Sequence, residues 1–258
     1  MIIVKIPFYE GGDVSPEGAD AVADQAEGFA LNESGLTPRI FQGNISLKGQ
    51  DVDGLCSSVA DAVARQPFGD RLCLVGGDHS VTYAGFKAFA AKNSGAGIVV
   101  LSSFPGCEAG GDSAVHRSFV KRILREGIVS ADRVVLFGLR EWTGDEKQFI
   151  ESSKVRSFSM RQIEMNSLSD VADGLTELLN SWQSIYLSVG IDVADPSCAP
   201  GVDDTSPGGL SARQLLYLVQ RLRLMRNLKM IDVIGVDAGK DINCMTSRLA
   251  AKIIVELS

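Results

Sequence analysis

Histidine and paired cysteines are scarce in this sequence. Its 258 residues include two histidines, His79 and His116, and five cysteines, no two of which are close enough to form a Cys-x-x-Cys pair. An odd number of separated thiols is typical of a reduced cytosolic protein. We therefore expect most of the cysteines to serve as small hydrophobic residues.

Long apolar runs and an excess of basic charge are also absent. No segment approaches the ~20 consecutive apolar residues that a membrane span needs. With 25 Lys and Arg against 32 Asp and Glu, the formal net charge is −7, which argues against nucleic acid or an anionic membrane as partner. The opening stretch MIIVKIPFYEGGD has no basic region and no cleavage signal, so we expect a first strand and a cytoplasmic protein.

Buried strands and amphipathic helices alternate along the chain. Continuous β-branched runs predict six strands, at residues 1–6, 71–77, 97–102, 133–139, 184–192 and 230–237. Apolar residues at helical spacing predict six helices, at residues 51–65, 81–92, 115–126, 168–179, 212–223 and 246–257. This alternation predicts an α/β fold, with three αβα layers around a mostly parallel, doubly wound sheet. Without repeats or an obvious linker, residues 1–258 are expected to form a single domain.

Polar residues gather in loops that follow four of these strands, where an open parallel sheet normally places its functional groups. The sequence GGDHS contains His79, a candidate metal ligand, and Asp78, which we expect to cap the next helix. The sequence LSSFPGCEAGGDSAVH ends at His116, at an expected helix start. Asp192 and Asp237 end the two later strands.

These motifs, in this order, resemble the ureohydrolase superfamily of arginase, agmatinase and formiminoglutamase. GGDHS before a helix is similar to the family's first metal motif, and SVGIDVADPSCAPGVDDTSPGGLS is similar to its Ser-x-Asp-x-Asp-x-x-Asp-Pro segment. VHRSFVKRILREGIV resembles the His-Gly-Thr-x-Phe helix, and MTSRLAAKIIVEL resembles the C-terminal helix. The resemblance runs from about residue 70 to the end and implies an arginase-like fold.

The resemblance also implies two Mn²⁺ ions, held by six side chains and bridged by a hydroxide that attacks a guanidinium or similar carbon. Two of these ligand positions keep their residue, His79 and Asp192. The other four, placed from the spacing to His116 and within the later loop, carry Ser102, Phe104, Gly106 and Gly190. His116 itself matches the proton-relay histidine of arginases, although Arg117 follows it where the family has glycine.

Loss of these ligands predicts loss of the metal centre. Two divalent ions bring four positive charges, which a buried site must neutralise with anionic ligands. Loss of a second-layer partner alone weakens a metal site about 10- to 100-fold, so loss of four ligands should abolish the pair. Without the metals nothing generates hydroxide at neutral pH, and His116 as a general base would add only roughly 10²- to 10⁴-fold.

We therefore expect an arginase-like protein that is inactive as an amidine hydrolase and holds no cofactor. It would act as a binding or regulatory subunit, either in a homo-oligomer (trimer or hexamer, as the family implies) or with an active homologue, and a small molecule is a candidate ligand. The alternative is a hydrolase of linear amidines such as agmatine, arginine or formiminoglutamate, with a rebuilt site or a single Mn²⁺ or Zn²⁺ ion.

The residues expected around the pocket are Cys107, Glu108 and Asp237. In the rebuilt enzyme, a thiol beside a histidine is a candidate nucleophile. A third hypothesis is that the chain is an active metal enzyme whose ligands come from other aspartates of the strand-end loops: Asp112, Asp203, Asp204 and Asp237.

Overall fold

Eight parallel strands form one sheet in the computed structural model, which describes residues 1–11, 17–65, 71–109 and 114–258. The strand order is β2-β1-β3-β8-β7-β4-β5-β6. The bounds are β1 (Ile2–Ile6), β2 (Phe41–Asn44), β3 (Leu72–Gly76), β4 (Ala96–Leu101), β5 (Val134–Leu139), β6 (Arg156–Ser159), β7 (Ser184–Gly190) and β8 (Leu228–Ile234).

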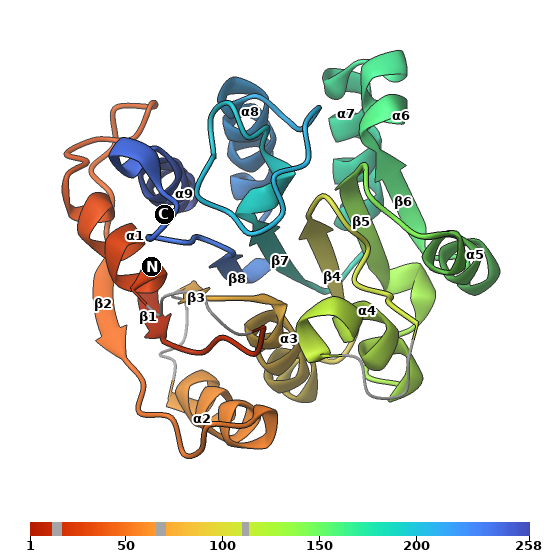
Figure 1. The fold of residues 1–258 in the computed structure, drawn as a ribbon, viewed down its shortest axis with the longest axis horizontal. Coiled ribbons are helices and arrows are strands. Elements are labelled where there is room, and N and C mark those ends of the chain that lie inside the picture. The colour runs from red at the N-terminus through yellow and green to blue at the C-terminus, as the bar shows by residue number, and fades with distance from the viewer. Residues whose placement is uncertain (12–16, 66–70, 110–113) are drawn as a thin grey trace.

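Helices cover both faces of this sheet (Figure 1). One hydrophobic core lies under α1 (Gly18–Glu27), α6 (Met160–Asn166), α7 (Leu168–Asn180), α8 (Ala212–Arg223) and α9 (Met245–Leu257). A second core lies under α2 (Val52–Arg65), α3 (His79–Lys92), α4 (Val115–Arg125) and α5 (Gly144–Ser153). The predicted three-layer αβα fold is confirmed, and the sheet is parallel throughout.

The six predicted strands and six predicted helices all form, and the differences lie at the margins of the sheet. Both edge strands, β2 and β6, were missed because the sequences FQGN and RSFS each hold a single large apolar residue. Three helices, α1, α5 and α6, were also missed. In the described part of the chain, no helix combines the length and apolar character needed to cross a membrane.

The sheet order places four loops together. Strands β3 and β4 follow each other among the strands of the chain, yet β8 and β7 lie between them in the sheet. Because all four strands are parallel, their C-terminal ends meet at one edge, where the order of the strands reverses. The loops after β3, β4, β7 and β8 therefore converge on a single region.

Candidate functional site

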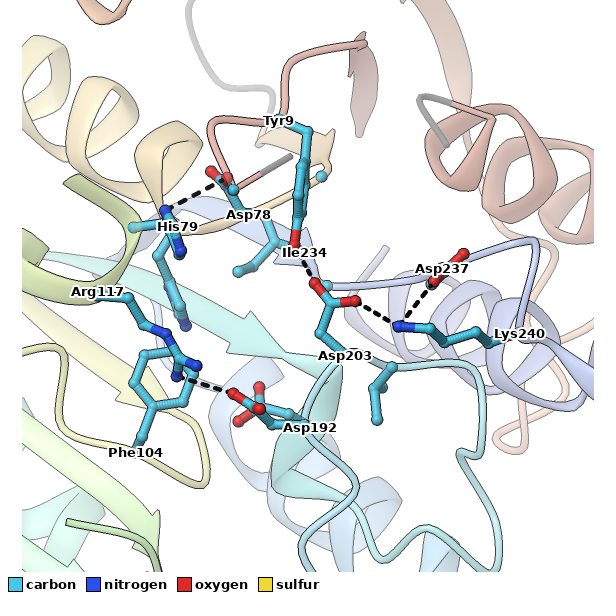
Figure 2. A pocket seen from close by; sticks show the side chains of 16 residues that line it. Tyr9, Asp78, His79, Phe104, Arg117, Asp192, Asp203, Ile234, Asp237 and Lys240 are labelled. Carbon is cyan, nitrogen blue, oxygen red and sulfur yellow. Dashed lines mark hydrogen bonds and ion pairs between the residues drawn. The ribbon is translucent and has the colours of Figure 1, made fainter. Parts of the chain in front are cut away.

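A cavity of about 440 Å³ opens at this edge of the sheet, and Figure 2 shows the side chains that line it. Its acidic groups come from three of the four loops: Asp78, Asp192, Asp203, Asp204 and Asp237. The other polar side chains of its wall are Tyr9, His79, His116, Arg117 and Lys240. Sequence reasoning had placed Asp237, both histidines and Asp192 near a pocket, and all four line this cavity.

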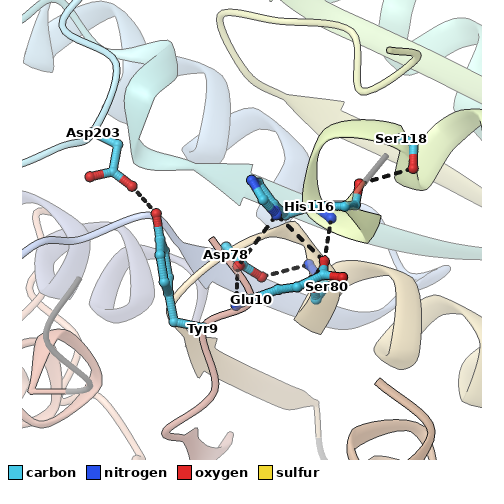
Figure 3. Close-up of polar contacts among 8 residues, drawn as sticks. Tyr9, Glu10, Asp78, Ser80, His116, Ser118 and Asp203 are labelled. Carbon is cyan, nitrogen blue, oxygen red and sulfur yellow. Dashed lines mark hydrogen bonds and ion pairs between the residues drawn. The ribbon is translucent and has the colours of Figure 1, made fainter. Parts of the chain in front are cut away.

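His116 is tied to two carboxylates at the start of α4 (Figure 3). Its Nδ1 lies 3.4 Å from Glu10 Oε2 and 3.9 Å from Asp78 Oδ2. Glu10 Oε2 also accepts a hydrogen bond from Ser80 Oγ, at 2.9 Å. The predicted cap is confirmed, because Asp78 Oδ1 accepts from the Ser80 N–H at 2.8 Å. These bonds fix the imidazole of His116 on the pocket wall.

His79 is enclosed by aromatic rings. Its ring stacks on Phe119 at a centroid distance of 4.2 Å, and Phe104 meets it edge-on at 5.4 Å. Only 2% of the residue is exposed, and Nε2 has no hydrogen-bond partner among the described residues. Burial, aided by the charges of His116 and Arg117, lowers the pKa of His79 to about 3. The imidazole is therefore neutral near pH 7.

A buried chain of hydrogen bonds runs from His79 into the sheet. His79 Nδ1 lies 3.0 Å from Thr82 Oγ1, which lies 3.1 Å from Ser188 Oγ. Ser188 donates to Asp232 Oδ1 at 2.7 Å, and Tyr186 donates to Asp232 Oδ2 at 2.8 Å. The back of the pocket is thus connected to a carboxylate in the middle of β8.

Asp232 should make stability depend on pH. Burial raises its pKa from 3.8 to about 6, so the folded protein holds this proton more tightly than the unfolded chain. The resulting stabilisation is full below pH 3.8 and is lost as the pH rises through about 6. At about 1.36 kcal/mol per pKa unit, the change is about 3 kcal/mol.

Urea unfolding of the unmodified chain and of Asp232→Asn, each at several pH values across this range, measures the effect. Other titrating groups are common to both proteins, so the difference between them isolates Asp232. The unmodified chain should lose stability relative to Asp232→Asn as the pH rises. A difference that stays constant with pH would contradict a raised pKa at Asp232.

Asp192 is held by donors from the β4 loop. Its Oδ2 accepts from Ser102 Oγ at 2.9 Å, from the Ser103 N–H at 2.6 Å and from Ser103 Oγ at 2.5 Å. The residue is 8% exposed, and no hydrogen bond within the described chain reaches Oδ1. Its two oxygens therefore differ, since one is saturated and the other faces the cavity.

Two glycines lie in the wall around His79 and Asp192: Gly190 borders both residues, and Gly106 borders Phe119. A Cβ at Gly190 would lie 2.4 Å from Asp192 Oδ1, 3.1 Å from the Leu101 carbonyl oxygen and 3.2 Å from His79 Nε2. A Cβ at Gly106 would lie 2.2 Å from Phe119 Cε1, and Gly106 has a φ of +64°. Neither position accepts a side chain without movement of its neighbours.

Ion pairs form another part of the cavity wall. Arg117 pairs with Asp204 at 2.8 Å, and its guanidinium lies 5.1 Å from the centre of the Phe104 ring. Lys240 pairs with Asp203 at 2.8 Å and with Asp237 at 3.3 Å. Tyr9 donates a hydrogen bond to Asp203. Each of these aspartates has a cationic partner within the described residues.

Two sequence predictions about this region are corrected. Cys107 is 1% exposed and packs in the hydrophobic core, where burial raises the pKa of its thiol to about 12. Glu108 is exposed and does not line the cavity. The turn at Gly106 directs the following residues away from the pocket, so neither Cys107 nor Glu108 belongs to its wall. Asp112 lies outside the described residues.

Tyr9, Glu10, Lys240 and Phe119 are site residues that sequence reasoning missed. Tyr9 and Glu10 follow β1, in the third of the chain where the family resemblance is weakest. Phe119 lies within a helix whose apolar spacing marks it only as a core residue. One signal could have identified Tyr9 and Glu10. They are polar residues that follow β1, and the C-terminal end of β1 lies at the same edge of the sheet as the pocket.

Comparison with known proteins gives the family. The model of the Arginase family matches residues 11–258. Mitochondrial arginase 1 of Oryza sativa subsp. indica is 29% identical over 247 residues, which cover 90% of this chain and 69% of that protein. The formimidoylglutamase of Halalkalibacterium halodurans is 28% identical over 188 residues, which cover 70% of this chain and 58% of that protein. The match to this relative thus spans less than two thirds of its length.

Solved structures agree at the level of the fold. Formimidoylglutamase from Bacillus subtilis superposes with a TM-score of 0.90 at 21% identity, covering 99% of this chain and 84% of that chain. Proclavaminate amidino hydrolase from Streptomyces clavuligerus gives a TM-score of 0.88 at 23% identity, covering 99% and 89%. With the family model matching residues 11–258, this chain belongs to the arginase family.

Proposed function

We propose that this arginase-family chain assembles no binuclear manganese centre and is a small-molecule-binding protein, not an amidine hydrolase. Relatives of similar sequence are named arginase and formimidoylglutamase, so the proposal depends on what differs in this chain. One observation carries it. The two retained ligand positions, His79 and Asp192, are surrounded by hydroxyl donors and aromatic carbon instead of further carboxylates.

The surroundings of Asp192 do not fit a metal pair. In a metal-binding arrangement, oxygens of neighbouring carboxylates would face the ions. Here Ser102 and Ser103 supply three donors that occupy Oδ2 of Asp192 and leave only Oδ1 without a hydrogen bond among the described residues. Restoring a carboxylate at Gly190 would bring its Cβ within 2.4 Å of Asp192 Oδ1.

The surroundings of His79 do not fit a metal pair either. Phe104 and Phe119 border its ring, and neither can coordinate an ion. Within the described residues, no group of three or more His, Cys, Asp or Glu side chains is arranged to hold a metal. Asp203, Asp204 and Asp237 are paired with Arg117 and Lys240, which disfavours their recruitment as substitute ligands. Asp78 instead accepts hydrogen bonds from the N–H groups of Glu10 and Ser80.

The pocket itself supports a binding role. It is an open-mouthed pocket of about 440 Å³ with several polar side chains and an aromatic wall, which is the common form of a small-molecule site. Fixed ion pairs and hydrogen bonds hold these side chains in place, so the pocket needs little rearrangement to accept a ligand.

A hydrolysis assay tests this function. The purified chain, supplied with excess Mn²⁺, is incubated with arginine, agmatine, guanidinobutyrate and formiminoglutamate, while an arginase serves as the positive control. We expect no release of urea or formamide above the rate without protein. Release that depends on Mn²⁺ from any of the four compounds would show that the chain is an active hydrolase.

A further inference from the structure

We propose that a second, open-mouthed cavity, at the opposite edge of the sheet, is a binding site for a phosphate group. Its volume is about 240 Å³, far above the roughly 10 to 15 Å³ that admits one water molecule, so it has room for a ligand group. Arg133 precedes β5, Arg156 opens β6 and Trp182 precedes β7, which places the cavity where these strands begin. Its described lining residues all differ from those of the first cavity, so the inference is independent of the proposed function.

Positive charge is concentrated in this cavity, although the chain as a whole is acidic. Three cationic side chains line it, Arg133, Lys154 and Arg156, against one carboxylate, Asp132. The formal net charge of the chain is −7. Like charges gathered in one cavity repel one another, and a bound anion relieves that repulsion.

These cations have little ionic pairing within the protein. Lys154 and Arg156 are exposed, and neither side chain forms a hydrogen bond or an ion pair with any residue that the structure describes. Arg133 Nε lies 3.8 Å from Asp132 Oδ2, and the Asp132 side chain is 76% exposed. An ion pair that is this long and this exposed contributes little, so the three charges remain available to a ligand.

Arg133 is held against the aromatic wall of the cavity. Its guanidinium carbon lies 5.9 Å from the centre of the Trp182 ring. Trp182 is 4% exposed and packs on Gly97, where a Cβ would lie 2.2 Å from Trp182 Cε3. Nη1 of Arg133 is enclosed, so a ligand meets the 29% of the side chain that is exposed. An arginine held in this way needs little ordering when an anion binds.

Lys154 and Arg156 present their charges on the same side of the chain. They flank Val155, which is 6% exposed, so the alternation of an extended chain directs both away from the core. Lys154 also ends α5 in the left-handed conformation, with a φ of +61°. Glycine is the residue that this conformation favours, so the chain carries a lysine where a glycine would be less strained.

The C-terminal end of α7 borders the cavity but does not need these cations. The Leu178 carbonyl accepts from the Ser181 N–H at 3.1 Å and from the Ser181 hydroxyl at 2.7 Å. The Leu179 carbonyl accepts from the Trp182 N–H at 3.0 Å and from Asn227 Nδ2 at 2.9 Å. Because these helix-end oxygens have donors of their own, an external acceptor does not compete with them.

The donors fit a phosphate group better than a carboxylate. A guanidinium group is a planar fork of N–H donors that pairs with two oxygens of an oxyanion. Two arginines and one lysine together offer more donors and more charge than a carboxylate, with two oxygens and one charge, can satisfy. A phosphate dianion brings a second charge and further acceptor oxygens. Sulfate has the same shape and charge and should bind at the same place.

The indole N–H signal of Trp182 reports on the site. The chain has two tryptophans, and a Trp142→Phe variant assigns the Trp182 signal in a ¹H–¹⁵N spectrum. Titration with sodium phosphate at constant ionic strength, at a pH where phosphate is a dianion, should shift this signal saturably, because Arg133 lies against the ring. Sodium sulfate should act in the same way. The absence of a saturable shift with phosphate, or an equal response to sodium acetate, would reject the site.

A pair of charge-matched variants separates a local site from an effect of overall charge. Arg156→Gln should weaken phosphate binding roughly 10-fold, because one charged donor is lost. Arg161→Gln removes the same charge beyond the opposite end of β6, outside the cavity wall, and should bind as the unmodified chain does. Equal weakening by both variants would contradict the proposal.

Lys154→Gly excludes misfolding as the cause of weaker binding. It removes a cation from the cavity and relieves the left-handed backbone, so urea unfolding should show a chain at least as stable as the unmodified one. Phosphate binding should nevertheless be roughly 10-fold weaker. Phosphate affinity that is unchanged in both Lys154→Gly and Arg156→Gln would overturn the inference.

Discussion

Gly106→Asp, which restores an aspartate at a family ligand position, should lower the free energy of unfolding by about 3 to 5 kcal/mol. The new Cβ would lie 2.2 Å from Phe119 Cε1, and Phe119 is fully buried and stacked on His79. The φ of +64° adds backbone strain for any residue with a side chain. Urea unfolding monitored by circular dichroism measures the loss.

Gly127→Asp separates the two causes. Gly127 has nearly the same φ, +67°, but a Cβ there would meet no atom within 4 Å. Its substitution should therefore cost only the backbone strain, about 1 to 2 kcal/mol. If Gly106→Asp costs no more than Gly127→Asp, Phe119 does not block this position, and an aspartate there is compatible with the fold.

Asp192→Ala is the second substitution with a large expected effect, a loss of about 3 to 5 kcal/mol in the free energy of unfolding. Removal of the carboxylate leaves the Ser102 hydroxyl and both donors of Ser103 buried without their acceptor. Thermal and urea unfolding, each compared with the unmodified chain, give the magnitude.

Asp192→Asn is the matched control for shape. Its amide oxygen can still accept hydrogen bonds from the two serines, so we expect it to retain most of the stability lost in Asp192→Ala. A cost below about 1 kcal/mol for Asp192→Ala, the net value of one ordinary hydrogen bond, would show that the serines do not depend on this carboxylate. Asp192 would then be free to act as a metal ligand.

The strands at the centre of the sheet were predictable because the burial of each strand is evident from its own sequence. Strands β3, β4, β5 and β7 are buried along their whole length, and continuous apolar, β-branched sequences such as GIVVL are typical of such buried strands. The edge strands β2 and β6 depend on neighbours more than on their own residues. Phe41 in β2 is 63% exposed, so its sequence carries no burial pattern.

The candidate site was predictable where a motif names the residue and its place. His79, His116, Asp192 and Asp237 all lie on strand-end loops, and the structure brings them to one cavity. The position of Cys107 was not predictable, because the direction of a side chain after a Pro-Gly turn depends on a left-handed glycine that the sequence does not specify.

The contacts between side chains on opposite walls of the pocket could not be predicted from the sequence, for a different reason. Tyr9 reaches Asp203, and Lys240 also reaches Asp203, through contacts between segments far apart in the chain. No spacing rule encodes such pairs. These contacts engage the carboxylates of Asp203 and Asp237 within the pocket wall.

Metal content tests the central claim most directly. The purified chain is incubated with excess Mn²⁺ or Zn²⁺ and desalted, and the metal bound per chain is counted by mass spectrometry. The proposed function predicts essentially no retained metal. Retention of two ions per chain would contradict it, because the residues at positions 102, 104, 106 and 190 would then not be the ones that replaced the ligands. A single tightly held ion would contradict it as well, by placing a rebuilt metal site around His79 and Asp192.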